Sequence, residues 1–357
     1  MFYRLSGIRH TRYEQDRQLW PLSFDRALVA AVVLLLLAAP LLVSSLYLTS
    51  YLLPWLIWAA ATLGLNILMG GAGQVHLGYG AVMAIGAYGA VHLARAGVPF
   101  ELALPAGGLL AAGIGSLFGA AALRVKGLYL AIATLAMQYL VDFVVVHVPA
   151  ISGGTQATLQ APQIRFLGLP LAGDAANYYF VLAVCALIAL FMLNIRRTSF
   201  GRALAAIREK DYAAEIIGVS TFRYKLLAFW VSSFIGGVVG GLFAFCYYKA
   251  VTPEQFHLDL SIQILAAVIV GGMGSVLGSF LGAALILLMP VLLNNLIAWA
   301  TKLFALPIRA DFAAHAPLVL YGAMIVGFLL FEPLGLAKIY DTVRTYFLVW
   351  PFRHARR

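Results

Sequence analysis

The side chains able to do chemistry in this chain are polar residues inside or beside long apolar runs. They are Asn66, Gln74, His76, Gln138, Asp142, His147, Gln263, Asn294 and Asn295. Gln138 and Asp142 stand four residues apart, so they share one face of a helix. A carboxylate inside a membrane is energetically unfavourable, which makes Asp142 a functional candidate that lines a path or relays a proton. The alternative is a structural pair between Asp142 and a polar group on a neighbouring helix or a partner subunit.

Enzyme chemistry and metal binding find little support in the residue pattern. Asp142 and His147 are five residues apart, a poor spacing for two metal ligands on one helix. No nucleophile–base arrangement is present, and no glycine-rich segment ends in the Gly-Lys-Ser/Thr of a phosphate-binding loop. Cys185 and Cys246 stand in separate apolar runs, as small packing residues do. We therefore expect no catalytic residue, no metal and no cofactor bound by this chain.

The composition is that of a membrane protein. Of the 357 residues, 63% are hydrophobic and 11% charged, with a mean hydropathy of +0.93. A soluble domain is about 45–50% apolar. Runs of about 20 apolar residues mark helices that cross a hydrocarbon core of about 30 Å. The sequence predicts an all-α polytopic membrane protein. The net charge of +10 gathers in short segments beside apolar runs, which indicates contact with membrane lipid and not with nucleic acid.

Apolar runs predict about ten transmembrane helices. They cover residues 27–48, 51–70, 76–95, 102–122, 128–148, 177–195, 226–248, 260–277, 280–300 and 315–333. With this threading, 19 of the 24 lysines and arginines fall on one side, so both termini are expected in the cytoplasm.

The same threading divides the chain into three parts. We expect a retained cytoplasmic N-terminal segment at 1–26, a transmembrane domain at 27–333 and a cytoplasmic basic tail at 334–357. The loop at 149–176 falls on the outer side, and the loop at 196–225 falls in the cytoplasm. No second soluble domain is predicted.

Two apolar segments are dense in glycine, at 64–90 and 268–286. They predict glycine-broken helices near 70–80 and 271–282. Broken helices in matching positions point to a transport path, because freed backbone groups survive only inside protein or beside a water-filled cavity. The alternative is close helix packing through small residues. The candidate path residues are Asn66, Gly70, Gly71, Gly73, Gln74, His76, Gly78, Gln138, Asp142, Gly271, Gly272, Gly274 and Gly278.

A charged stretch, "AIREKDYAAEIIGVSTFRYK" at 206–225, interrupts the apolar runs. Small and apolar residues recur at helical spacing over 199–217, and Gly218 stands where a helix would end. We expect one short cytoplasmic helix, joined to the next span, that docks on a partner. An amphipathic helix lying on anionic lipid is the alternative. The residues assigned to this docking are Arg208, Glu209, Ala213, Ala214, Glu215 and Gly218.

Five segments together carry a resemblance to a known family. They are "GLNILMGGAGQVHLGYGAVMAIGAYGA" (64–90), "LRVKGLYLAIATLA" (123–136), "GRALAAIREKDYAAEIIGVSTFRYKLLAF" (201–229), "VTPEQF" (251–256) and "VIVGGMGSVLGSFLGAAL" (268–285). In this order the chain resembles the LivM-type permeases of the branched-chain amino acid ABC importers. It differs from them at Gln74-Val75-His76, where relatives often carry an acidic residue or serine.

The resemblance implies an importer subunit in the bacterial inner membrane. Its expected partners are a paralogous LivH-like permease subunit, two ATPase subunits that hold ATP and Mg²⁺, and a periplasmic solute-binding protein. The expected cargo is a branched-chain or related hydrophobic amino acid, with urea, short amides or aromatic acids as alternatives in the same family. A different class, an ion-coupled secondary transporter that uses Asp142, is the remaining alternative.

Overall fold

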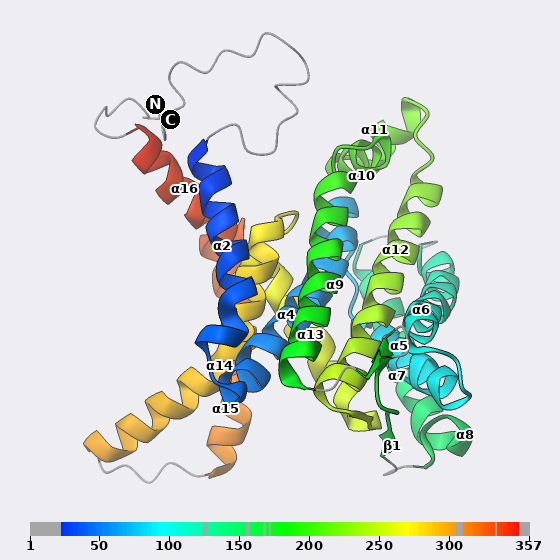
Figure 1. The fold of residues 1–357 in the computed structure, drawn as a ribbon. Helices are drawn as coiled ribbons and strands as arrows, with labels where there is room; N and C mark the ends of the chain where they lie inside the picture. Colours follow the sequence, from blue (N-terminus) through cyan, green and yellow to red (C-terminus); the bar gives the residue numbers. More distant parts are fainter. Residues whose placement is uncertain are drawn as a thin grey trace.

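The computed structural model describes residues 23–123, 127–154, 158–166, 169–170, 173–304, 310–332 and 334–349. Helices make up nearly all regular structure in these ranges (Figure 1). The strands are β1 Leu159–Gln160, β2 Arg165–Phe166, β3 Leu169–Pro170 and β4 Ala250–Val251. β1 pairs antiparallel with β4, and β2 with β3. The predicted all-α polytopic class is confirmed.

The helices are long where the sequence is continuously apolar and short where glycine or charge interrupts it. In chain order they are α2 Ser23–Leu42, α3 Ser45–Tyr47, η1 Leu48–Leu52, α4 Leu53–Asn66, η2 Ile67–Gly71, α5 Tyr79–Arg95, α6 Phe100–Ala122, α7 Leu128–His147, α8 Pro149–Ser152, α9 Asp174–Ile195, α10 Ser199–Glu209, α11 Asp211–Ile216, α12 Thr221–Leu242, η3 Phe243–Tyr247, η4 Pro253–Phe256, α13 Leu258–Gly271, α14 Val276–Phe304, α15 Ala310–Phe331 and α16 Gly335–Val349.

The number of full spans is lower than predicted. All ten predicted segments overlap helices, but in the described ranges seven helical segments are long and apolar enough to cross a membrane. An eighth is reached if α15 and α16, bent by 47°, count as one span. α13 has 14 residues, so it rises only about 21 Å, and α5 has 17. α5 begins and α13 ends at a glycine element, so both are too short to count among the seven full spans found in the described ranges.

The glycine breaks lie where the sequence predicted them. η2 is followed by one more helical residue, Ala72, and the non-helical residues 73–78 then lead into α5; residues 272–275 separate α13 from α14. η2 itself is a π-helical turn that continues α4. The two segments are therefore broken helices and not continuous spans.

Glycines on α5, α6 and α12 allow these three helices to pack with their backbones in contact. A Cβ atom at Gly86 of α5 would collide with the backbone of Gly237 on α12. A Cβ at Gly107 of α6 would reach the carbonyl oxygen of Gly86 at 2.6 Å. Small residues at helix interfaces permit this approach and strengthen van der Waals packing in a membrane. We call these three helices the glycine-packed bundle.

The predicted cytoplasmic segments gather at one end of the molecule. α2 begins, and α16 ends, at the end that also carries α10 and α11 (Figure 1). Arg344 of α16 forms a two-point ion pair with the buried Asp25 of α2. Part of the predicted basic tail is thus a helix bound to the first span. The rest of that tail, and residues 1–22 of the predicted N-terminal segment, lie outside the described residues.

Candidate translocation and coupling site

Asn66, at the end of α4, joins the two glycine elements. Its side chain is fully buried. Its amide nitrogen donates to the carbonyl oxygen of Ser275 at 3.1 Å and to the hydroxyl of Ser279 at 2.9 Å. Its amide oxygen accepts the backbone N–H of Gly274 at 2.7 Å. One side chain therefore satisfies backbone groups that the break before α14 leaves unpaired, as buried polar groups require.

Glycine is required at the point of contact. Gly272 and Gly274 have φ angles of +117° and +84°, which side-chain-bearing residues rarely adopt. Across from them, a Cβ at Gly70 would collide with the backbone of Gly274 and with the Asn66 amide oxygen. A Cβ at Gly271 would likewise meet the carbonyl of Gly278. We call the contact region of Asn66, Gly70, Gly274, Ser275 and Ser279 the glycine junction.

Arg208 connects the charged helix α10 to this junction. Its guanidinium donates to the carbonyl oxygen of Gly70 at 2.7 Å. The side-chain stem of Arg208 also lies 3.3 Å from the Cβ position of Gly73, and Leu204 of α10 lies 3.4 Å from that of Gly71. The sequence placed Arg208 on an outward docking face. In the structure Arg208 stays exposed to solvent, and its guanidinium contacts the broken end of the first glycine element.

The rest of the first break packs against α7 and α12. His76 is buried; its Nδ1 accepts the Gly78 N–H at 3.0 Å, and its ring lies 5.2 Å from that of Phe229. Leu77 donates its N–H to the hydroxyl of Thr134 at 3.0 Å. Gln74 makes a local bond to the carbonyl of Ala72 at 3.2 Å. His76 and Gly78 therefore lie within the protein and away from the Asn66 contacts.

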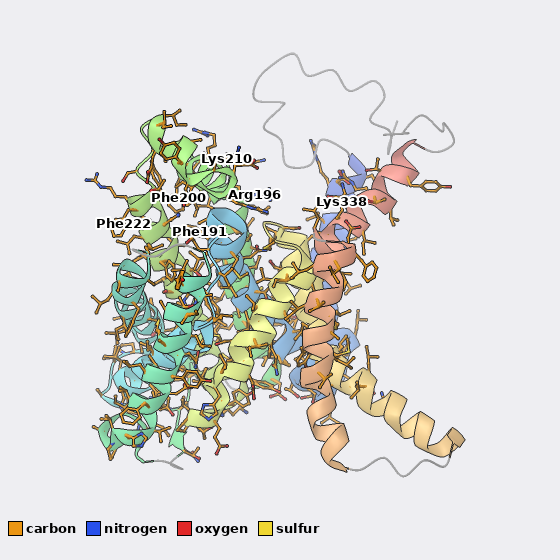
Figure 2. The ribbon with its side chains drawn as sticks, turned by 180° about the vertical axis from the view of Figure 1, so that it is seen from behind. Phe191, Arg196, Phe200, Lys210, Phe222 and Lys338 are labelled. Atoms are coloured by element: carbon orange, nitrogen blue, oxygen red, sulfur yellow. The ribbon has the colours of Figure 1, made fainter. Side chains whose placement is uncertain are left out.

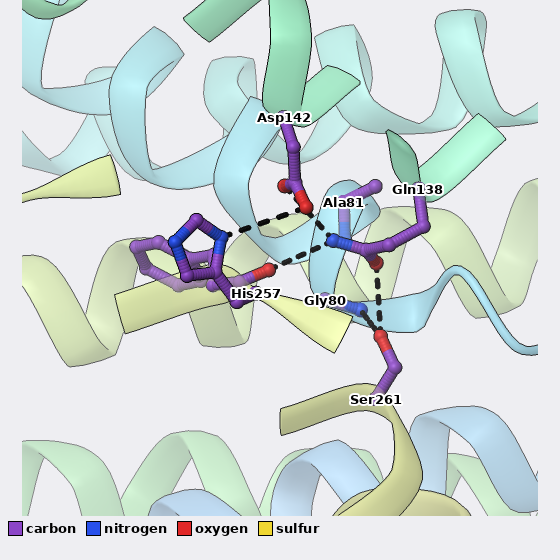
Figure 3. Close-up of polar contacts among 7 residues, drawn as sticks. Gly80, Ala81, Gln138, Asp142, His257 and Ser261 are labelled. Carbon is purple, nitrogen blue, oxygen red and sulfur yellow. Dashed lines mark hydrogen bonds and ion pairs between the residues drawn. The ribbon is translucent and has the colours of Figure 1, made fainter. Parts of the chain in front are cut away.

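Gln138 of α7 forms a second polar centre around the start of α5 (Figure 3). Its amide oxygen accepts the N–H of Ala81 at 2.8 Å and the hydroxyl of Ser261 at 2.9 Å. Ser261 in turn accepts the N–H of Gly80 at 2.7 Å. The first N–H groups of a helix have no partner within it. Side chains from α7 and α13 thus cap α5 in place of its own residues.

Asp142 completes this centre as a paired carboxylate (Figure 3). One oxygen accepts from the Gln138 amide nitrogen at 3.0 Å, and the other lies 3.5 Å from Nδ1 of His257. The same Gln138 nitrogen also donates to the carbonyl of Phe256 at 2.9 Å. These contacts correspond to the structural pair, the alternative to a proton relay. His147 bonds only to its own helix, at the Phe143 carbonyl, among the interactions described for it.

Sequence reasoning missed the serines and His257. Ser261, Ser275 and Ser279 supply four of the contacts above. Serine is common in apolar helices and was not counted as a candidate. A usable signal was present, since Ser275 and Ser279 are four apart and share a helix face beside the second glycine element. The side chain of Asn294 lies outside the described residues.

The predicted docking helix is two helices. Lys210 has extended backbone, with φ −154° and ψ 107°, and separates α10 from α11. Gly218, with φ +88°, follows the end of α11, as predicted. Ala214 is buried, so the expected pair of small docking residues is reduced to Ala213. The outward face is instead formed by Tyr212, Ile216 and Ile217, each at least 70% exposed.

Two side-chain contacts fix α11 to α12. Lys225 of α12 forms an ion pair with Asp211, and Thr221 donates its hydroxyl to Glu215. Both contacts lie in the first turns of α12, the helix that enters the glycine-packed bundle. Glu215 therefore bonds within the chain, which supports a stiff joint between α11 and α12.

A cavity of about 410 Å³ lies between α10 and the glycine junction. Its lining residues are Asn66, Ile67, Gly70, Gly71, Met192, Ile195, Arg196, Gly201, Arg202, Leu204, Ala205, Arg208, Glu209, Met273 and Gly274. Several predicted path residues thus face one shared space. In the part of the chain that the structure describes, no three His, Cys, Asp or Glu side chains are grouped to hold a metal ion.

The sequence resembles known transport permeases. Residues 46–329 match the family described as branched-chain amino acid transport system / permease component. The chain is 32% identical over 305 residues to the high-affinity branched-chain amino acid transport system permease protein LivM of Escherichia coli K12, covering 79% of this chain and 68% of that protein.

Two relatives from Methanocaldococcus jannaschii extend the comparison. A probable branched-chain amino acid transport permease protein LivM is 23% identical over 226 residues, covering 62% of this chain and 64% of the relative. A probable LivH permease is 32% identical over 136 residues, covering 38% and 42%. No solved structure matches the chain significantly. The chain therefore belongs to the branched-chain amino acid transport permeases: it is a multi-pass permease component of an ABC transport system and not an enzyme.

Proposed function

We propose that this chain carries branched-chain or related hydrophobic amino acids across the bacterial inner membrane as one of two permease subunits. A LivH-like chain is the second permease, two ATPase subunits bind ATP and Mg²⁺, and a periplasmic binding protein delivers the solute. The family membership supports the ATPase and binding-protein partners. The partial likeness to a LivH protein supports a paralogous second permease of similar design.

The observation that carries the mechanism is the bond from Arg208 to the carbonyl of Gly70. It connects α10, in the predicted ATPase-docking loop, with the junction at which the two broken helices meet. Tyr212, Ala213, Ile216 and Ile217 form an apolar outward face next to Glu209, and this face fits a groove on an ATPase. Two sets of contacts transmit a movement of this face to the membrane helices.

The first route is the α11–α12 joint. Because Lys225–Asp211 and Thr221–Glu215 hold α11 to the first turns of α12, a push on α11 tilts α12 and the glycine-packed bundle with it. The second route is Arg208. A shift of α10 pulls on the Gly70 carbonyl and changes the contact of Gly70 with Gly274 across the junction. Opening and closing of this contact switches the path between the two sides of the membrane.

Uptake in cells tests this function. Labelled leucine, phenylalanine, urea and benzoate are supplied one at a time to cells with and without the chain, and a parallel set is depleted of ATP. We expect ATP-dependent uptake of leucine to require the chain. Chain-dependent uptake of urea or benzoate alone would assign a different cargo. Uptake that survives ATP depletion but collapses with the proton gradient would contradict the importer mechanism.

Variants of the docking segment test the coupling step. Replacement of Glu215 by alanine removes the bond to Thr221, and replacement of Gly218 by valine places a branched side chain at a positive φ angle. Both variants are expected to lower ATP-driven uptake. Unchanged uptake in both would rule out the coupling role of this segment.

A further inference from the structure

The cavity between α10 and the glycine junction combines three kinds of surface. Arg196, Arg202 and Arg208 contribute positive charge and Glu209 contributes one carboxylate. Its apolar wall is formed by Ile67, Met192, Ile195, Leu204 and Met273. The volume of about 410 Å³ lies within the range of about 300–1,000 Å³ typical of small-molecule sites. We call this space the arginine cavity.

The arginines keep donors available for a ligand. In the described part of the chain, Arg208 gives one N–H to the Gly70 carbonyl, and Arg202 gives one to the carbonyl of Arg197 at 3.0 Å. Each guanidinium has five N–H donors in a planar fork that matches a carboxylate. Figure 2 shows Arg196 beside α10, close to the end of the molecule that carries Lys210.

These three surfaces match the three parts of a hydrophobic amino acid. A carboxylate pairs with the arginines, an ammonium group pairs with Glu209 or the Gly70 carbonyl, and an aliphatic side chain lies along the apolar wall. An inorganic phosphate would use the arginines alone and would leave the apolar wall exposed to water. The lining therefore favours an amphipathic anion over a purely polar one.

We propose that the arginine cavity is a binding site for the transported amino acid on the cytoplasmic side. The proposal rests on the function proposed above and names a place in this chain where that cargo is held. Arg208 faces both the cargo and the Gly70 carbonyl. A bound carboxylate, held by the free donors of Arg208, draws the guanidinium toward the cavity and weakens its bond to the Gly70 carbonyl. Amino acid accumulated in the cytoplasm thereby slows its own import.

The binding test uses the full-length chain, purified with its partner subunits in lipid nanodiscs and without the solute-binding protein. Calorimetric titrations compare L-leucine, 4-methylpentanoate, 3-methylbutylamine and inorganic phosphate. L-Leucine is expected to bind best, 4-methylpentanoate more weakly, and 3-methylbutylamine and phosphate very weakly. Binding of phosphate but not of leucine would overturn the proposal, as would equal binding of leucine and 3-methylbutylamine.

Variants assign the binding to this cavity. Arg196→Gln and Arg202→Gln are each expected to weaken leucine about ten- to hundredfold, the loss of a charge-assisted hydrogen bond. Glu209→Gln is expected to weaken L-leucine but not 4-methylpentanoate, which has no ammonium group. Lys338→Gln is the control, because Lys338 is a cation near the same end of the molecule, on α16, and does not line the cavity (Figure 2). Unchanged leucine affinity in both arginine variants would overturn the proposal.

Measurements of leucine import distinguish the cytoplasmic binding site proposed here from the importer function proposed above. Proteoliposomes loaded with L-leucine are expected to import leucine more slowly than empty ones, and Arg196→Gln is expected to reduce that inhibition. ATP-driven import without any effect of internal leucine would contradict the cytoplasmic site and leave the importer function standing. No ATP-driven import of any hydrophobic amino acid would contradict the importer function itself.

Discussion

Glycines in the bundle of α5, α6 and α12 and glycines in the junction below α10 both bring backbones into contact, but by different means. In the bundle, Gly86 and Gly237 sit within regular helices and serve only to remove side-chain volume. In the junction, Gly274 adopts a positive φ angle, and its freed backbone N–H bonds to Asn66. The bundle is therefore suited to move as one body, and the junction is suited to change its contacts.

The largest effect on folding is expected from a larger side chain within the glycine-packed bundle. Gly86→Val would drive a branched side chain into the backbone of Gly237. Overpacking of this kind costs about 1–3 kcal/mol or more, because the neighbouring backbone cannot yield. We expect the folded yield, measured by size-exclusion chromatography of the detergent-solubilised chain, to fall sharply. Gly113→Ala is the matched control, since a Cβ at Gly113 on α6 has no atom within 4 Å; a similar loss there would contradict the packing argument.

Filling the junction is expected to block transport more than folding. Gly70→Ala places a methyl group against the backbone of Gly274 and the Asn66 amide, so the two elements must separate. We expect the folded yield to persist and ATP-driven uptake to fall by about tenfold or more, because the path residues no longer meet. Gly71→Ala meets only the end of Leu204, at 3.4 Å, and serves as the neighbouring control. Equal uptake by the two variants would remove the special role of the Gly70 contact.

Asn66→Ala weakens the junction without adding volume. It leaves the N–H of Gly274 and the hydroxyl of Ser279 without this partner, at a cost of about 1–3 kcal/mol for an unsatisfied buried group. The variant is expected to lower both thermal stability and uptake. Ser279→Ala, which removes one of the three contacts of Asn66, should have a smaller effect on both. An Asn66 variant as stable and active as the unmodified chain would show that the junction does not depend on this side chain.

The smallest effect is expected at the second polar centre. Asp142→Asn keeps an oxygen that accepts from Gln138, so we expect ATP-driven uptake to change by no more than about twofold. Uptake is measured over a range of pH with the ATP supply held constant. Loss of uptake in Asp142→Asn would favour the proton-relay alternative over the structural pair.

The sequence predicted the features that depend on local pattern. Long apolar runs marked the membrane helices, and clustered glycines marked the breaks at 73–78 and 272–275. The end of the docking segment at Gly218 followed from the same reasoning. These features depend on a few neighbouring residues, so a single sequence carries them.

Contacts between residues far apart in the chain could not be predicted from the sequence. Asn66 bonds to Ser275 across 209 positions, and Arg208 bonds to Gly70 across 138. Helical spacing placed Ala214 on the small apolar stripe and Arg208 on the charged remainder of the helix, but it did not say which distant residues each side chain contacts. No glycine or proline stands at Lys210, where α10 ends and α11 begins, so the local sequence did not predict this break.

The central claim is that α10 acts on the glycine junction through Arg208. The most direct test is the amount of leucine imported per ATP hydrolysed, measured in proteoliposomes that contain the complete transporter with Arg208→Gln or Arg223→Gln. Arg223 is an exposed cation at the start of α12 and serves as the control. We expect Arg208→Gln to lower this ratio about tenfold while ATP hydrolysis continues, and Arg223→Gln to leave it unchanged. An unchanged ratio in Arg208→Gln would contradict the account.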